Sequence, residues 1–505
     1  MVPHRKALVF VRRLASLAIL SLLGVPTTVQ AAPGEGRLSR DLREAMAAGQ
    51  ATYRVIVQGD AATVQSVAQR HGGRVAKQLK TGAVIEVTRD ALEAMSTDPG
   101  VGHLAGDTLV RSQMAVSAQA MGADQAWAGV LSGVAAATGR GIGVAVIDSG
   151  VSNHSALQGR VLTTVDFTGS NGAAGDQYGH GTHVAGIIAG AGDGFRGVAP
   201  GANLVSLKVL RADGSGRTSD VIAAIDWAID HREQYGLRII NLSLGRPVYD
   251  SYRDDPLTQA VERAYRAGLV VVAAAGNYGK TPDGQLVVGG ITSPCNSPYT
   301  LCVGAVDTRG TVGRSDDQVP PWSSRGPTYL DTVVKPDLVA PGTGIHSLYV
   351  PGSYLARTYP ERQTSGSGQS ALFRLSGTSM SSAAAAGAAA VVLQINPGLT
   401  PAQVRMTLQI TSSFMPDAGL VGAGAGSLNL AAAVQVAKFG PDLAGIGSSV
   451  GGETVSLSGL AFGADGPDVS GTTLVWGNTL VWGNTLVWGN TLVWGNTLVW
   501  GNTLV

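Results

Sequence analysis

The sequence predicts an α/β protein with a doubly wound, mostly parallel sheet and helices on both faces, preceded by a small α+β domain. Two observations predict the large sheet: short apolar strands alternate with helix-like segments between residues 142 and 275, and polar or glycine residues follow the strands. A third observation, a βαββαβ order of elements before residue 111, predicts the small domain. The length of 505 residues is enough for more than one domain.

The composition is typical of a compact protein with a net charge close to zero. The chain has 70 glycines and only 14% charged residues, which favours a turn-rich fold. Lys and Arg total 36, Asp and Glu total 35, and the net charge is +1. We therefore expect neither nucleic acid nor an anionic membrane as partner.

The amino terminus is typical of an export signal. Arg5, Lys6 and Arg12-Arg13 precede the apolar run 14–25, and small residues at 29–31 suit cleavage, so residues 1–31 are predicted to be a signal peptide. A twin-arginine route and a retained anchor are the alternatives. The mature protein is expected to be secreted, to the medium or the cell envelope, and to have no membrane span.

The segment 51–111 has the pattern of a ferredoxin-like domain. The hydrophobic patterns predict strands at 53–57, 74–79, 83–87 and 101–109 and helices at 61–71 and 90–96.

The segment 126–437 is predicted to form the large domain. It has strands at 142–147, 203–210, 237–244 and 269–275 and helices at 218–233 and 256–267, with further helices after His180 and after Ser379. Thr400, Pro401 and Gln403 have the spacing of a capping box and predict the start of a late helix.

Four polar residues follow or precede these elements at the positions that nucleophilic catalysis requires. A serine hydroxyl needs a base, a residue that orients the base, and a donor to the oxyanion. Asp148 ends a strand, His180 lies in a glycine turn before a helix, Asn277 ends another strand, and Ser379 precedes an alanine-rich helix. Each alone is more typical of a turn or a cap. Their joint occurrence favours a catalytic site, to which a backbone N–H after Ser379 would add a second oxyanion donor.

The segments VIDSG, HGTHVAG, NLSLG, AAAGN and SGTSM resemble the signature blocks of the subtilisin-like serine peptidases, in the same order. The resemblance covers roughly residues 126–437. It implies that Asp148, His180 and Ser379 form the catalytic triad and that Asn277 donates to the oxyanion. His183 matches the second histidine of the motif, which is not the base.

The resemblance also implies a secreted serine endopeptidase that acts through an acyl-enzyme, without a cofactor for the chemistry. It assigns Ser243, Leu244 and Gly245 to an exposed strand edge that pairs with extended peptide, and Ala274, Ala275 and Gly276 to the wall of the primary pocket. Broad specificity with an apolar preference would follow. From the residues alone, 243–245 is equally well a core strand that ends in a turn.

In this position the domain 51–111 resembles the inhibitory propeptide of the same family. The resemblance implies a zymogen that processes itself between Val110 and Gly122, with the propeptide as an intramolecular inhibitor. A permanent accessory domain is the alternative.

One departure from the family pattern concerns the residues after the serine. Ala383 and Ala384 stand where relatives usually have proline and histidine. The alanine-rich helix is still expected to form, so the departure bears on the level of activity. It also leaves a second hypothesis, a catalytically inactive peptidase-like protein used for binding or adhesion.

Cys295 and Cys302 are the two cysteines of the chain. In an exported protein they are expected to form a disulfide, with free thiols as the alternative, and two ligands are too few for zinc. Structural calcium is common in the family, but the loop after His180 has no acidic cluster, so no residue is assigned to a metal.

The carboxyl end is of a different kind. Residues 440–472 read as a glycine-rich linker or a small β segment, and residues 473–505 repeat TLVWGN five times before a final TLV. A period of six is a multiple of the strand period of two, so we expect a β-like or disordered tail. It could stack as coils, self-associate, attach to a surface or have no defined role, and a truncated reading frame is also possible.

Overall fold

The structure is a computed structural model that describes residues 37–107, 109–112, 119–169, 175–192, 195–364, 366–443, 446–450 and 452–463, and five short strands between 473 and 499. The predicted signal peptide, 1–31, and most of the repeat tail lie outside these residues.

The main sheet has seven strands, and every neighbouring pair is parallel. Its order is β7 (Val161–Asp166), β10 (Asn203–Lys208), β6 (Gly143–Asp148), β12 (Leu237–Leu242), β14 (Val270–Ala274), β15 (Thr300–Val306) and β16 (Leu338–Pro341). The first strand of the domain, β6, is therefore internal, and the chain adds strands on both sides of it. This is the predicted doubly wound α/β fold, with β6 beside the point where the winding reverses.

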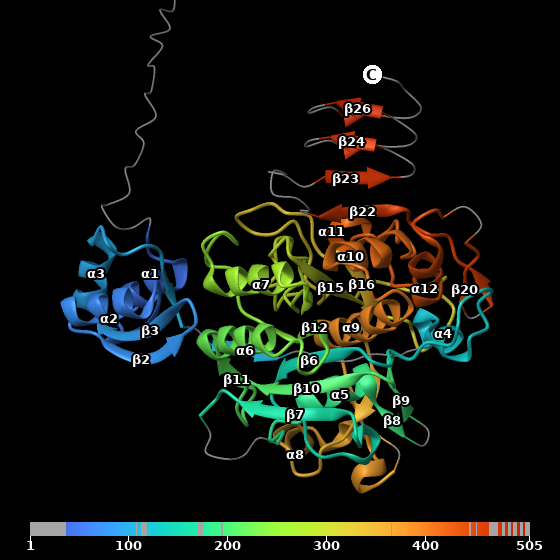
Figure 1. Cartoon of the computed structure of the whole chain (residues 1–505), viewed down its shortest axis with the longest axis horizontal. Coiled ribbons are helices and arrows are strands. Elements are labelled where there is room, and N and C mark those ends of the chain that lie inside the picture. The colour runs from blue at the N-terminus through green and yellow to red at the C-terminus, as the bar shows by residue number, and fades with distance from the viewer. Residues whose placement is uncertain are drawn as a thin grey trace, which may run out of the picture.

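Helices cover both faces of this sheet (Figure 1). One face carries α5 (His180–Ala189), α9 (Thr378–Ile395), α10 (Pro401–Ile410) and α12 (Leu430–Phe439), and the other carries α6 (Thr218–Asp230) and α7 (Pro256–Arg266). Strand β6 shows the expected alternation, because Val144 and Val146 join the core under α5 and α9, while Ala145 and Ile147 join the core under α6. All four are buried, so β6 lies between the two cores.

Shorter elements complete the large domain. They are α4 (Ala123–Ala128), β8 (Ala191–Gly192), β9 (Phe195–Arg196), β11 (Ser215–Arg217), β13 (Leu244–Gly245), β17 (Ile345–Leu348), α8 (Tyr354–Thr358), β18 (Gln363–Thr364), β19 (Leu372–Leu375) and α11 (Gly419–Ala423).

Two predicted strands end two residues earlier than expected. Strand β10 ends at Lys208 because the N–H groups of Val209 and Leu210 both donate to the carbonyl of Asp148, the last residue of the neighbouring strand. Strand β12 ends at Leu242 because the chain then leaves the main sheet and forms β13 in another one.

The predicted capping box is confirmed. Thr400 Oγ1 accepts from the N–H of Gln403, and Gln403 Oε1 accepts from the N–H of Thr400, with Pro401 as the first residue of α10. The alanine-rich helix is present as α9, in which Ala383 and Ala384 are fully buried.

Helix α9 is the one helix of the described residues that is long and apolar enough to cross a membrane, but 89% of it is buried inside the protein. It packs against five strands of the main sheet, β6, β12, β14, β15 and β16, and against α5, α10 and α12. Its apolar character therefore belongs to the core of the domain.

Residues 37–107, called here the N-terminal module, form a separate antiparallel sheet. The strand order is β2 (Arg74–Leu79), β3 (Gly82–Thr88), β1 (Thr52–Gln58) and β4 (Leu104–Gly106), and the helices α2 (Ala61–Arg70) and α3 (Arg89–Thr97) connect them as the ferredoxin-like plan requires. The sequence reading missed a first helix, α1 (Arg40–Ala47), from which Leu42 enters the module's core.

The last strand predicted for this module, 101–109, was wrong in its extent. Strand β4 covers three residues, and a separate strand, β5 (Leu109–Ser112), pairs with β11 and β13 of the large domain instead. The chain leaves the module at Asp107, whose carboxylate is bonded to the start of α6.

The glycine-rich stretch contains a small β segment. It has β20 (Ser449–Val450), β21 (Glu453–Thr454) and β22 (Leu460–Gly463), and Leu460 and Phe462 are buried against Ala425 of the large domain. The N–H of Ser458 donates to the carbonyl of Ser412, and that of Gly459 to the carbonyl of Ile410. These residues therefore dock on the domain.

The described parts of the repeats are short strands stacked above β22 (Figure 1). They are β23 (Thr473–Trp476), β24 (Leu480–Trp482), β25 (Leu486–Val487), β26 (Leu492–Trp494) and β27 (Leu498–Val499). The parallel pairs join Leu474 to Leu486 and Leu486 to Leu498, an offset of 12 residues, and Leu480 to Leu492 by the same offset. Each turn of this stack thus uses two repeats.

Candidate active site

Asp148 and His180 are hydrogen-bonded at the carboxyl end of β6. Asp148 is the last residue of this strand and His180 is the first residue of α5. Nδ1 of His180 lies 2.7 Å from Oδ1 of Asp148, and both side chains are fully buried. Because a carboxylate can only accept, Nδ1 carries the proton, and Nε2 of the neutral ring is left as the acceptor.

Ser379 is the second residue of α9. Its Oγ donates to the carbonyl of Ser243 at 3.0 Å, and its own carbonyl accepts from Oγ of Ser243 at 2.6 Å. Ser243 follows directly after β12, so these two bonds tie the start of α9 to the carboxyl edge of the main sheet.

Asn277 lies beside the start of the same helix. Its Oδ1 accepts from the N–H of Thr378 at 3.1 Å and from Oγ1 of Thr378 at 3.2 Å. A backbone N–H can only donate, so the oxygen must be the atom that faces Thr378, which leaves the NH₂ group of the side chain as a donor next to Ser379. The preceding residues Ala274, Ala275 and Gly276 are buried at the end of β14, and the N–H of Gly276 donates to Oγ1 of Thr378.

The predicted peptide-binding edge is occupied by the chain itself. Strand β5 lies between β13 and β11 and is antiparallel to both. Gly245 is paired with Arg111 and Leu244 with Ser112, while Gly216 of β11 is paired with Val110. The sequence reading missed β11, although the turn residues Asp-Gly-Ser-Gly before α6 were a signal for an exposed loop.

Three buried polar residues behind His180 were also missed by sequence reasoning. Asp176 accepts four hydrogen bonds around the first turn of α5, and Ser149 Oγ is one of the donors. Nζ of Lys208 donates to the carbonyls of Ser149 and Gly175, each at 2.9 Å. The one signal in the sequence was an acidic residue four positions before the histidine, which is common in unrelated turns.

Burial dominates the ionisation of these groups. It raises the pKa of Asp176 against the hydrogen bonds from Thr182, Gly179 and Ser149, which lower it. Burial lowers the pKa of Lys208, while Asp176 acts in the opposite direction. Burial also lowers the pKa of His183 to about 3, and its Nε2 lies 2.9 Å from the carbonyl of Phe373, so this histidine is neutral at ordinary pH.

Cys295 and Cys302 form a disulfide, as expected, beside β14 and within β15. No group of three or more His, Cys, Asp or Glu side chains in the described part of the chain is arranged to hold a metal ion. The expectation of structural calcium stays untested, and no step of the chemistry below depends on it.

Comparison with known proteins identifies the family of this chain. Residues 139–439 match the model of the subtilase family. The chain is 41% identical to serine protease AprX of Bacillus subtilis (strain 168) over 301 residues, a match that covers 58% of this chain and 66% of AprX, just under two thirds. It is 35% identical over 300 residues to subtilisin DY of Bacillus licheniformis, with 59% of this chain and 92% of that protein covered.

Subtilisin E of Bacillus subtilis (strain 168) matches at 33% identity over 376 residues, which are 74% of this chain and 86% of that protein. That longer match also takes in part of the chain outside residues 139–439, because 376 exceeds the 301 residues of the family match. The chain therefore belongs to the subtilase family and is a serine endopeptidase.

Proposed function

We propose that this subtilase cleaves peptide bonds through Asp148, His180 and Ser379. His180 takes the proton of the Ser379 hydroxyl, the serine attacks the peptide carbonyl, and His180 then passes the proton to the leaving amine. Water releases the acyl-enzyme. Asp148 holds the imidazole in the tautomer that leaves Nε2 unprotonated, so that this nitrogen can act as base. The observation that carries the proposal is the buried 2.7 Å contact between Asp148 and His180 at the carboxyl edge of the sheet.

The hydroxyl of Ser379 has to change partners for this chemistry. In the structure it donates to the carbonyl of Ser243. During attack it would instead donate to Nε2 of His180. Catalytic hydrogen bonds of this kind commonly tighten only when substrate is bound, so the starting geometry is compatible with the role.

Asn277 is proposed to stabilise the oxyanion. Its oxygen is held by Thr378, the residue before the nucleophile, so the amide N–H groups need no reorganisation when charge develops on the substrate. The N–H groups at the start of α9 would supply a second donor.

Substrates are proposed to bind as extended strands between β11 and β13. The pairing of β5 with both strands supports this mode, since backbone hydrogen bonds of this kind accept almost any unfolded chain. The small buried residues Ala274, Ala275 and Gly276 support broad specificity with an apolar preference, as the sequence implied.

The N-terminal module is proposed to be an inhibitory propeptide. The strand that follows the module, β5, occupies the position proposed for a substrate. Asp107 of the module accepts from the N–H of Ser219 at 3.0 Å, where α6 has no side-chain cap of its own. Lys77 bonds to Asp220 in the first turn of the same helix. The module would therefore block the groove and stabilise a helix of the enzyme at the same time.

The register of β5 also supports a proposal for the processing bond within the expected interval from Val110 to Gly122. Ser112 is opposite Leu244, and the next residue back in the antiparallel partner is Ser243, whose carbonyl contacts Oγ of Ser379. A bound chain that kept this register would bring the carbonyl of Gln113 to the nucleophile. We therefore propose self-cleavage between Gln113 and Met114.

Export and the role of the tail complete the proposal. The basic and apolar pattern of residues 1–31 supports secretion, to the medium or the cell envelope. The pairing of repeats at an offset of 12 residues supports a stacked, coil-like tail that could self-associate or attach to a surface.

Labelling with a fluorophosphonate, which reacts with activated serines, tests the proposed site. The full-length protein should take one label and mature to a product that begins at Met114, as read by N-terminal sequencing. Ser379→Ala should take no label, stay uncut and lose about 10⁶-fold in turnover.

The outcomes separate the two hypotheses. A folded wild-type protein that matures but takes no label would favour the inactive binding protein. A labelled protein with a different new N-terminus would keep the triad and reject the register argument.

A further inference from the structure

We propose that Asp176 is a positioning residue for His180. Its carboxylate joins the turn after Asp148 to the start of α5, and its negative charge opposes the partial positive charge at the start of that helix. This inference deepens the proposed function, because it rests on His180 as the base. Asp176 lies outside the proposed triad and would act only through the groups that it holds.

The carboxylate of Asp176 accepts four short hydrogen bonds from groups of the protein. Oδ1 accepts from the N–H of Gly179 at 2.6 Å and from Oγ of Ser149 at 2.8 Å. Oδ2 accepts from the N–H and from Oγ1 of Thr182, at 2.8 and 2.7 Å. The residue is 4% exposed, so these donors replace water almost completely.

These donors come from both halves of the proposed catalytic pair. Ser149 directly follows Asp148, and Gly179 directly precedes His180. Ser149 Oγ also accepts from the N–H of Gly181, on the other side of His180, at 2.8 Å. One buried carboxylate therefore fixes the separation between the orienting aspartate and the base.

The residue just before α5 has no side chain that could cap the helix, so Asp176 accepts from the N–H groups there. The residue in the capping position is Gly179, with φ of 96° and no side chain to accept from the first turn. A cap from within the turn would need a side chain at a position where positive φ favours glycine. Asp176, three residues earlier, supplies the acceptor instead.

The same geometry has an electrostatic consequence for His180. The N–H groups at a helix start carry partial positive charge, which disfavours an imidazolium at the first helical residue. His180 is that residue, and it must become an imidazolium in the proposed mechanism. A carboxylate bonded to the first turn opposes this penalty.

The charged groups around Asp176 come from three elements. His180 and His183 lie on α5, Asp148 ends β6, and Lys208 ends β10. Nζ of Lys208 donates to Oε1 of Gln177 at 2.6 Å and to the carbonyls of Ser149 and Gly175. Lys208 therefore bonds to the backbone at Ser149 and at Gly175, and all three of these acceptors are neutral oxygens.

The substitution Asp176→Asn tests the proposal in the mature enzyme that the full-length chain yields on processing. An amide has one acceptor atom and no charge, so it cannot replace the four bonds or oppose the helix end. We expect kcat to fall about 10- to 100-fold with KM changed less than about twofold. The acidic limb of the pH profile of kcat/KM should move to lower pH by about one unit, since the imidazolium loses a nearby negative charge.

Asp337→Asn is the matched control. Asp337 is also a buried carboxylate of this domain, bonded to the N–H of Cys302 and to Nζ of Lys335, but it contacts none of the proposed catalytic residues. A purely structural loss there should reduce stability and leave both the kcat of the folded enzyme and the pH profile unchanged.

A second variant, Ser149→Ala, keeps the proposal testable if Asp176→Asn does not fold, because an unchanged kcat in Ser149→Ala would then overturn it. Ser149→Ala removes one donor and keeps the charge, so we expect a smaller loss of kcat with an unmoved acidic limb. NMR titration of the His180 imidazole in the full-length Ser379→Ala chain, with and without Asp176→Asn, needs no activity, and it separates failure of this inference from failure of the proposed function.

A lower titration midpoint in the Asp176→Asn chain supports the inference, whether or not the wild type takes the fluorophosphonate label. An unmoved midpoint in the folded variant, or a pH profile of Asp176→Asn that superimposes on that of the wild type, overturns it.

Discussion

The turn at the start of α5 and the docking face of the N-terminal module both depend on acidic side chains, but in opposite ways. Asp176 is buried and bonded to four neutral donors of its own domain. The docking face, where β2 of the module meets α6 of the large domain, also includes ion pairs at its surface, such as Lys80 with Asp230, whose side chains are 46% and 55% exposed. Exposed pairs contribute only about 0–1 kcal/mol each and weaken with salt.

The difference matches the two proposed tasks. Groups that hold a catalytic geometry have to be rigid, and buried, fully satisfied networks are rigid. A propeptide has to be released, so its attachment is better made from contacts that water can replace. The docking face also has buried contacts that water cannot replace. Asp107 and Asp220 are nearly fully buried, and Ile56 and Leu79 of the module pack in one apolar cluster with α6.

The largest change in kcat is expected in the candidate active site, where the groups are held rigidly. Asn277→Ala removes an oriented donor and should lower kcat about 100- to 1,000-fold with little change in KM. Steady-state kinetics on a peptide substrate measure it. Asn203→Ala, at the amino end of β10, is the control and should keep wild-type kcat. Equal kinetics for the two variants would contradict an oxyanion role for Asn277.

On the docking face the largest expected effect is at Asp107. Asp107→Ala removes the cap of α6 and leaves Arg54, which lies 2.9 Å from its carboxylate, without this partner. A lost cap costs about 1 kcal/mol or more, so amide exchange at Ser219 in the uncut Ser379→Ala chain should become about tenfold faster.

Glu93→Ala, which removes an exposed ion pair with Arg89 on α3, serves as the control for Asp107 and should leave this exchange rate unchanged. The role of Asp107 as a cap would be rejected by unchanged exchange at Ser219 when Asp107 is removed.

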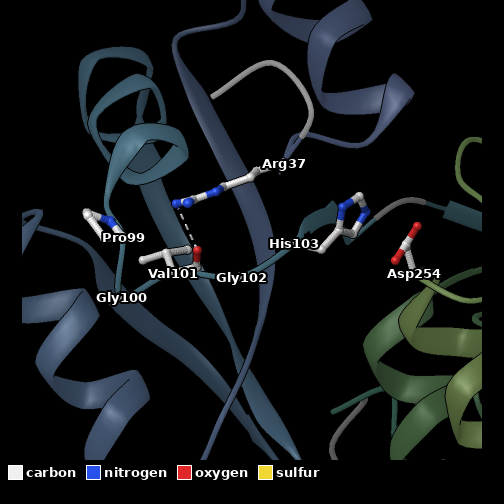
Figure 2. A pocket seen from close by; sticks show the side chains of 7 residues that line it. All are labelled: Arg37, Pro99, Gly100, Val101, Gly102, His103 and Asp254. Carbon is white, nitrogen blue, oxygen red and sulfur yellow. Dashed lines mark hydrogen bonds between the residues drawn. The ribbon is translucent and has the colours of Figure 1, made fainter. Parts of the chain in front are cut away.

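The smallest expected effect is a pH dependence of docking through His103. This residue of the module lies 3.2 Å from Asp250 of the enzyme, and it lines a pocket together with Asp254 (Figure 2). Burial lowers its pKa, but the hydrogen bond and charge of Asp250, with Asp254 and Asp255, outweigh burial and raise it overall.

A histidine whose pKa is raised by docking contributes to docking at low pH, and the contribution is lost as the pH rises through the raised value. The charged groups nearby do not reverse this sign. Burial also raises the pKa of Asp41 on α1, and Arg246 is paired with Asp255 at 2.8 Å. The module should therefore leave faster at pH 8 than at pH 5.5.

The lag before activity appears, normalised to mature enzyme at each pH, measures this release. His103→Gln should reduce the ratio of the two rates, by up to about tenfold. His71→Gln, which removes a contact with Asp98 inside the module, is the control. An equal pH dependence in the wild type and in His103→Gln would reject the proposed coupling.

Much of the fold could be predicted because the relevant signals are local. The period of two in β6, the apolar helix after Ser379 and the capping box at Thr400 each depend on residues a few positions apart. The motifs likewise located Asp148, His180, Asn277 and Ser379 at strand ends and helix starts, and the structure brings Asp148 to His180 and Asn277 to the start of α9.

Only the tertiary structure decided which distant groups share a bond. Contacts between distant segments determine where β10 and β12 end and why β5 pairs with the large domain. They also determine the roles of Asp107 and Asp176, whose hydrogen-bond donors lie on other elements. The physical reason is that burial removes water as an alternative partner, so a buried carboxylate must find its donors wherever the fold places them. A sequence shows that Asp176 is acidic and near a histidine, but the four donors that determine its role become neighbours only when the chain has folded.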